Sequence, residues 1–114
     1  MLFSPNPGTV ASGVCTSKGQ ITEMSGTALS FLSSEALFTD GNNQTGRFTL
    51  DATALSSIFG SGILPAHGAV TGSFSFDLNS KGLALPSNGT VVVIGTGNGV
   101  VITFVGTLQC TGSP

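Results

Sequence analysis

The sequence predicts an all-β domain: an antiparallel β-sandwich, jelly-roll or immunoglobulin-like, or a small barrel of seven to eight strands with one short helix. Two features lead to this prediction: an alternating segment at 70–79 and a pair of β-branched runs at 90–94 and 100–110. Short apolar runs separated by Gly, Ser, Thr and Asn are typical of such folds. A chain of 114 residues fits one domain.

The strand predicted at 70–79 has the clearest two-residue period. Its even-numbered residues are Val70, Gly72, Phe74, Phe76 and Leu78, and its odd-numbered residues are all polar. Because successive side chains of a strand point to opposite faces, this pattern predicts one buried and one solvated face. Residues 79–82, Asn-Ser-Lys-Gly, predict the turn that follows.

The C-terminal third predicts a hairpin. Residues 90–94 are Thr-Val-Val-Val-Ile, and the strand at 100–110 places Ile102, Phe104, Leu108 and Cys110 on one face. The sequence Gly-Thr-Gly-Asn-Gly at 95–99 supplies the residues that hairpin connections favour.

Earlier segments give weaker signals. We expect strands at 9–17, 20–24 and 46–51, the last with Phe48 and Leu50 facing inward. Residues 28–38 fit either a helix or two strand pieces with a bulge, and we favour strand. Asp51 and Gly60 are typical N-cap and C-terminal residues, so we expect one short helix at 52–59, followed by a loop at 60–68.

We divide the chain into an extended N-terminal arm at 1–8 and a single β domain at 9–114. Pro5 and Pro7 favour an extended backbone in the arm. The arm is either disordered or docks the apolar side chains of Leu2 and Phe3 into a neighbouring subunit.

The two cysteines lie near opposite ends of the chain. Cys15 falls on an early strand, and Cys110 is in phase with the apolar face of the last strand. A disulfide between them closes a loop of about 94 residues, which contributes about 4–5 kcal/mol in the chain-entropy account. We predict this disulfide; the alternative is two free, buried cysteines in a cytosolic protein.

The charge content is low and excludes several classes of function. Only 7% of residues are charged, against roughly 25% in ordinary domains, and the net charge is −2. Three basic residues cannot neutralise a phosphate backbone, so we expect no nucleic-acid partner. No apolar run reaches the ~18 residues of a transmembrane segment. A surface of Ser, Thr and Gly is common among extracellular β proteins, which favours an extracellular or cell-surface location.

Candidate catalytic and ligand-binding residues are few. His67 is the only histidine and lies in the predicted loop, no G-x-S-x-G sequence is present, and Asp51 and Asp77 have structural explanations. The loop at 40–46 lacks the acidic residue and spacing of a calcium loop, and the glycines at 95–99 do not open a helix. We therefore predict no enzyme, no catalytic residue, no metal and no cofactor. Asn43 and Asn88 match glycosylation acceptors, which matters only in a eukaryotic host.

The absence of charge after Lys81 is the one feature that suggests a function. Residues 82–114 are uncharged yet contain both strongest β-forming runs. Soluble monomers usually place Lys, Glu or Pro along exposed strand edges. Either these strands are covered at the centre of a sheet, or they contact another subunit. The candidate subunit contacts are Leu2, Phe3, Val91, Val93, Val101 and Val105.

Three short windows resemble the small surface lipoprotein antigens of mycobacteria. These windows are residues 13–16 (Gly-Val-Cys-Thr), 37–42 (Leu-Phe-Thr-Asp-Gly-Asn) and 106–110 (Gly-Thr-Leu-Gln-Cys). The resemblance implies a β-rich domain enclosed by two distant cysteines and located at the cell envelope. The lipobox cysteine and Ser/Thr-rich tether of that family are absent, so lipid anchoring is not implied.

Together these patterns favour an extracellular or cell-envelope structural protein that is not an enzyme. We expect a self-assembling β-sandwich subunit of a filament or surface layer, whose partner is another copy of itself. The alternative is a monomeric secreted binding module: an adhesin, a surface antigen or a carrier of an apolar ligand. A carrier would hold its ligand between sheets lined by Phe48, Phe74, Phe76 and Phe104. A small hydrolase using His67 is the least favoured function.

Overall fold

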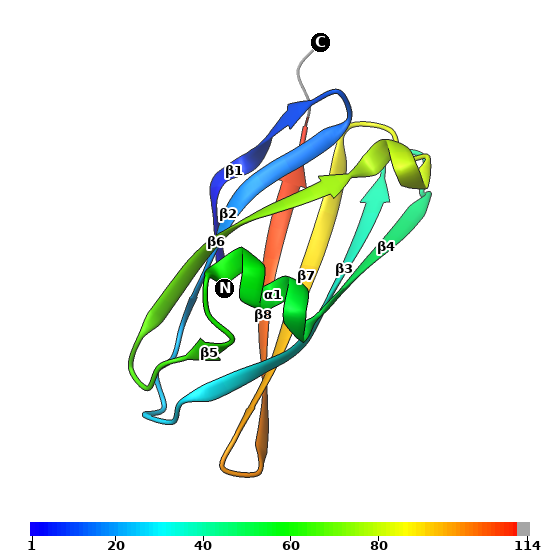
Figure 1. Ribbon diagram of the computed structural model, residues 1–114. Helices are drawn as coiled ribbons and strands as arrows, with labels where there is room; N and C mark the ends of the chain where they lie inside the picture. The colour runs from blue at the N-terminus through cyan, green and yellow to red at the C-terminus, as the bar shows by residue number, and fades with distance from the viewer. Residues whose placement is uncertain (112–114) are drawn as a thin grey trace.

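The computed structural model describes residues 1–111 and arranges them as a sandwich of two antiparallel sheets (Figure 1). The elements are β1 (Leu2–Ala11), β2 (Val14–Thr22), β3 (Leu29–Asp40), β4 (Thr45–Asp51), α1 (Ala52–Phe59), β5 (Ile63–Leu64), β6 (Ala69–Asp77), the 3-10 helix η1 (Leu78–Lys81), β7 (Ser87–Gly97) and β8 (Val100–Cys110).

The smaller sheet has the strand order β1-β2-β6, and the larger has the order β4-β3-β7-β8 with β5 paired to β3. The two sides of the sandwich are closed differently. On one side α1 contacts β3, β4 and β6, so the helix covers the gap between the sheets. On the other side β1 contacts β8. The length of β8 that β1 contacts on this second side determines how much of the β8 edge is left uncovered.

Aromatic side chains fill the space between the sheets. The ring of Phe38 lies 5.7 Å from that of Phe48 and 5.0 Å from that of Phe76, measured between centroids. Phe48 also lies 5.3 Å from Phe76. Phe74 and Phe76 are buried, as the alternation at 70–78 predicts. Because these rings pack directly on one another, Phe48, Phe74 and Phe76 form part of the core between the sheets.

The all-β sandwich and the short helix at 52–59 are confirmed within residues 1–111. The Asp51 carboxylate accepts a 2.8 Å hydrogen bond from the Ala54 N–H at the start of α1, and Gly60 ends the helix with φ +73°. The ambiguous segment at 28–38 is strand, as favoured. Its register against β7 shifts between Phe31 and Ser33, which is the expected bulge.

Several predicted boundaries are wrong, and two of the errors concern two-residue turns. The expected strand at 9–17 is divided by a turn at Ser12 and Gly13, where φ is +51° and +79°. The hairpin turn is only Asn98-Gly99, so Gly95 and Gly97 belong to β7. The strand predicted to reach residue 79 ends at Asp77, whose carboxylate accepts from the Ser80 N–H and starts η1. The predicted loop at 60–68 contains β5.

The N-terminal arm predicted at 1–8 is part of the domain. Leu2 and Ser4 pair with Gln20 and Lys18 of β2, and the buried ring of Phe3 packs edge-on against a core phenylalanine. The two prolines of β1 lie in the irregular stretch between Ser4 and Thr9, where the ladder to β2 is interrupted. The backbone is extended as predicted, but it forms an integral strand.

Candidate functional site

A disulfide marks one end of β8. Cys15 of β2 and Cys110 of β8 are bonded, with their Cα atoms 6.0 Å apart, and both are fully buried. The bond joins the smaller sheet to the larger one and confirms the predicted pairing. We call this region, around Cys15 and residues 105–110, the closed end.

Strand β1 covers the outer edge of β8 only at the closed end. The N-terminal ammonium group of Met1 donates to the Val105 carbonyl at 3.4 Å. The Asn6 amide donates to the Thr107 carbonyl at 3.0 Å and accepts from the Gln109 N–H at 2.9 Å. The side chain of Asn6 therefore replaces the backbone ladder that the prolines of β1 prevent.

Between the hairpin turn and Val105, the outer edge of β8 has no covering strand. Gly97 and Val100 flank the two-residue turn, so they form a hydrogen-bonded pair. Because the backbone groups of successive residues point to opposite sides, the N–H and C=O of Val101 and Thr103 point away from β7. Strand β8 is the last strand of its sheet. Within residues 1–111, no hydrogen bond from another segment reaches these groups.

The inner face of β8 is also incompletely covered there. Leu108 and Cys110 are fully buried, whereas Ile102 and Phe104, on the same face, are only half-buried. They line a groove of about 310 Å³ together with Leu29 and residues 22–25, at the end of β2. Met24, at the rim of the groove, is 83% exposed. We call residues 100–104 and 22–25 the open seam.

Glu23 fixes the wall of the open seam that lies opposite β8. Its buried carboxylate accepts hydrogen bonds from the Ser25 hydroxyl and from the backbone N–H groups of Ser25, Gly26, Thr27 and His67. The Ser25 side chain and the His67 N–H lower the pKa of Glu23 to about 2. The carboxylate is therefore ionised, and both of its oxygens accept hydrogen bonds from groups of the same chain.

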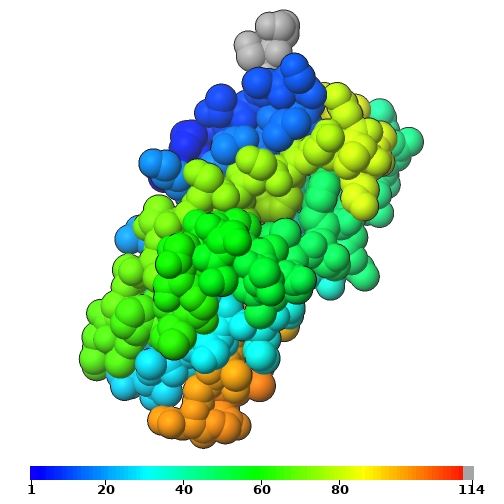
Figure 2. Space-filling model, in the orientation of Figure 1, coloured from blue at the N-terminus to red at the C-terminus, as the bar shows by residue number. Residues whose placement is uncertain are grey.

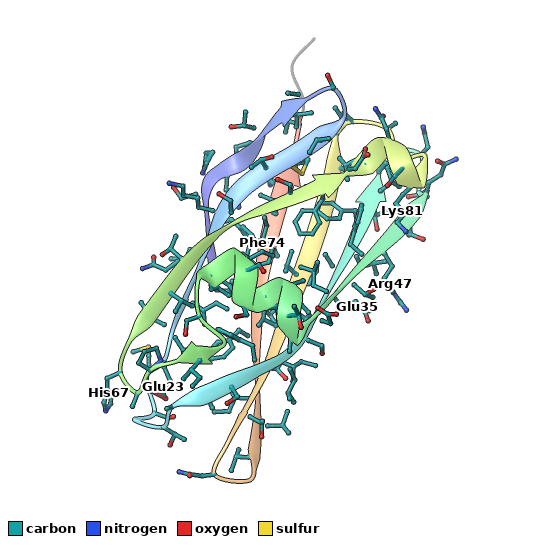
Figure 3. All side chains as sticks on the ribbon, in the orientation of Figure 1. Glu23, Glu35, Arg47, His67, Phe74 and Lys81 are labelled. Carbon is teal, nitrogen blue, oxygen red and sulfur yellow. A yellow bond between two sulfur atoms is a disulfide. The ribbon has the colours of Figure 1, made fainter. Side chains whose placement is uncertain are left out.

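His67 takes part through its backbone. It lies beside Glu23 at the same end of the molecule (Figure 3), and its N–H donates to that carboxylate at 2.9 Å. Asp40 has the same structural role elsewhere: its carboxylate accepts from the N–H groups of Asn42, Gln44 and Ala84, which lowers its pKa and holds the 40–46 loop. Both arrangements organise loops by hydrogen bonding.

Apart from Glu23, three charged side chains that contact other groups lie away from the open seam. Arg47 and Glu35 form an exposed ion pair at 3.1 Å, and the Lys81 ammonium lies 5.4 Å above the Phe48 ring. Glu35, Arg47 and Lys81 all lie near β4, on the other side of the sandwich from Glu23 (Figure 3). Among residues 1–111, no group of three or more His, Cys, Asp or Glu side chains could hold a metal ion. No helix of the described chain is long and apolar enough to span a membrane.

The structure divides the six predicted contact residues into two groups. Phe3, Val91 and Val93 are buried in the core, so their prediction as subunit contacts is corrected. Strand β7 lies between β3 and β8, and its odd-numbered side chains point between the sheets. Leu2, Val101 and Val105 are 73%, 62% and 53% exposed.

Sequence reasoning missed Val100, which is 55% exposed at the hairpin tip. A valine directly after an Asn-Gly turn was the signal that could have identified it. The tip projects at one end of the molecule in the ribbon and in the space-filling view (Figures 1 and 2). Val100 and Val101 are therefore exposed to solvent at the projecting tip of the larger sheet.

Comparison with known proteins assigns no family. No protein-family model matches the sequence, and no curated protein matches it significantly. The resemblance to mycobacterial surface lipoprotein antigens therefore stays a prediction.

Proposed function

We propose that this chain is an extracellular or cell-envelope structural protein, without enzymatic activity, whose copies assemble through the open seam. The observation that carries the proposal is the unpaired outer edge of β8 beside Val101, which is 62% exposed. An edge of this kind accepts another strand, because the added strand satisfies its free N–H and C=O groups. A filament or surface layer is the assembly that we expect.

The charge distribution supports self-association. Natural proteins protect exposed strand edges with Lys, Glu or Pro, and residues 100–110 contain none of these. Because the only carboxylate in the seam, that of Glu23, is occupied by internal hydrogen bonds, two copies meet there with little electrostatic repulsion.

An extracellular location is supported by the covalent bond between Cys15 and Cys110, since disulfides persist mainly in oxidising compartments. The Ser-, Thr- and Gly-rich composition and the resemblance to envelope lipoproteins agree with this location. These features support the proposal for the compartment independently of the open seam.

Replacing Val101 by Lys tests the assembly. A charged side chain beside the free edge should oppose strand addition, so V101K should stay monomeric at concentrations where the wild type forms larger species. The measurement is sedimentation velocity over a concentration series, with electron microscopy of the concentrated wild type. T49K is the matched control, because Thr49 is exposed on β4, the opposite edge of the same sheet. A wild type that sediments as a monomer at every concentration contradicts the proposal.

The groove favours a second candidate, a monomeric module that binds an apolar ligand. Ile102, Phe104 and Leu29 give the 310 Å³ groove an apolar lining. This function predicts that a monomeric wild type binds an environment-sensitive apolar dye and that F104S loses the binding. An unchanged dye signal in F104S argues against it.

A further inference from the structure

We infer that the strand received at the open seam is β8 of a second copy, paired antiparallel about a two-fold axis at Ile102. This inference rests on the proposed self-association and adds to it the partner strand and the register. In this arrangement Val101 of each copy lies opposite Thr103 of the other, and the two Ile102 residues face each other.

The free backbone groups select this register. Val101 and Thr103 carry outward N–H and C=O groups to which no other part of the described chain donates or accepts a hydrogen bond. When Val101 of one copy lies opposite Thr103 of the other, all of these groups form hydrogen bonds. A pairing centred on Thr103 would instead use Val105, whose carbonyl already accepts from the Met1 ammonium. A pairing centred on Val101 would place Thr103 opposite Gly99, which is in the turn with φ +75°.

The side chains agree with the same register. The even-numbered residues of β8 point toward the groove, so the two Ile102 side chains become a non-hydrogen-bonded cross-strand pair, with Cα atoms about 4.5 Å apart. Phe104 of each copy then lies beside Val100 of the other. The second copy thus covers Ile102 and Phe104, which its own chain leaves half-buried, and removes Val100 from water.

The symmetry has a consequence for assembly. A two-fold contact uses the same surface on both copies and closes after two of them. The larger sheets of the two copies then form one continuous sheet through β8. Growth into a filament or layer therefore adds dimers through a different surface.

Cysteine cross-linking tests the register. Under mild oxidation, I102C should form a covalent dimer in most of the protein, because facing residues of a non-hydrogen-bonded pair bring their Cβ atoms within disulfide reach. T107C should remain monomeric on a denaturing gel, since Thr107 is an exposed β8 residue at the closed end. T103C is the diagnostic variant, because it should cross-link only if the axis passes through Thr103.

Three outcomes separate the inference from the proposed function. Cross-linking of I102C alone supports both. Association that V101K abolishes, with cross-linking of T103C in place of I102C, overturns the register and leaves self-association standing. A wild type that is monomeric throughout overturns both.

Amide hydrogen exchange of the wild type gives the same test without a substitution. The Val101 and Thr103 amides should become protected as the concentration rises into the range of association. Continued fast exchange at both amides in the associated protein overturns the β8 pairing, even if the cysteine variants do not fold.

Discussion

The two halves of β8 are buried to different extents although their sequences share the same apolar alternation. Both place alternate apolar side chains on the inner face, yet Leu108 is fully buried and Ile102 is half-buried. The difference arises outside the strand: Met1 reaches β8 at Val105, and β1 lies along β8 only from there to Gln109. Burial along this edge strand therefore depends on where the neighbouring strand begins.

The two ends are also held by different chemistry. At the closed end, a covalent bond joins β2 to β8. At the open seam, the segment after β2 is held by hydrogen bonds to Glu23, and within residues 1–111 no hydrogen bond joins it to β8. We therefore expect the largest effects on folding from changes at the closed end and the largest effects on assembly from changes at the open seam.

Removing the disulfide should give the largest loss of stability. The double variant C15A/C110A should lose about 4–5 kcal/mol of unfolding free energy, because the unfolded chain regains the entropy of a loop with a sequence separation of 95. Urea unfolding at low protein concentration measures the loss. Unfolding of the reduced wild type is the control and should give a similar midpoint. A change below about 1 kcal/mol would mean that other contacts hold the closed end equally well.

Truncating matched side chains on the two halves of β8 should give unequal losses. L108A should cost about 2–5 kcal/mol because it empties a fully buried site, whereas I102A should cost about 1 kcal/mol in the monomer because its site is already partly open. Urea midpoints at a concentration below association measure both variants. Equal losses would show that the open seam is as well packed as the closed end.

Replacing Glu23 by Gln should produce a smaller effect that depends on pH. The hydrogen bonds lower the pKa of Glu23 from its usual 4.5 to about 2, so the ionised carboxylate stabilises the fold fully above pH 4.5. That contribution declines as the pH falls toward 2. E23Q should therefore be less stable than the wild type at pH 7, and the difference should shrink in acid.

Thermal unfolding between pH 2 and pH 7 measures the E23Q effect. The control is E35Q, which removes only an exposed partner of Arg47 and should change stability little. A difference between E23Q and the wild type that is constant over this range would argue against the lowered pKa.

Local signals in the sequence predicted much of the fold. The helix at 52–59 was predictable because Asp51 and Gly60 act within one turn of its ends, and the alternation at 70–78 is a property of one strand. The two-residue turns at Ser12-Gly13 and Asn98-Gly99 were harder, because other glycines in the flanking strands give the same local signal. Position 97 of β7 is a glycine for a tertiary reason, because a Cβ there would lie 2.3 Å from the Ala28 carbonyl oxygen, a long-range contact.

The sequence by itself determined the class of fold, the helix and the pairing of Cys15 with Cys110, because these depend on short-range periodicity, caps and a single pair of cysteines. Only the tertiary structure decided which apolar residues are exposed. Val93 and Val101 lie in equally apolar runs, but β7 is enclosed by two strands while the first half of β8 has one neighbour. The open seam follows from that missing neighbour, which no pattern within β8 encodes.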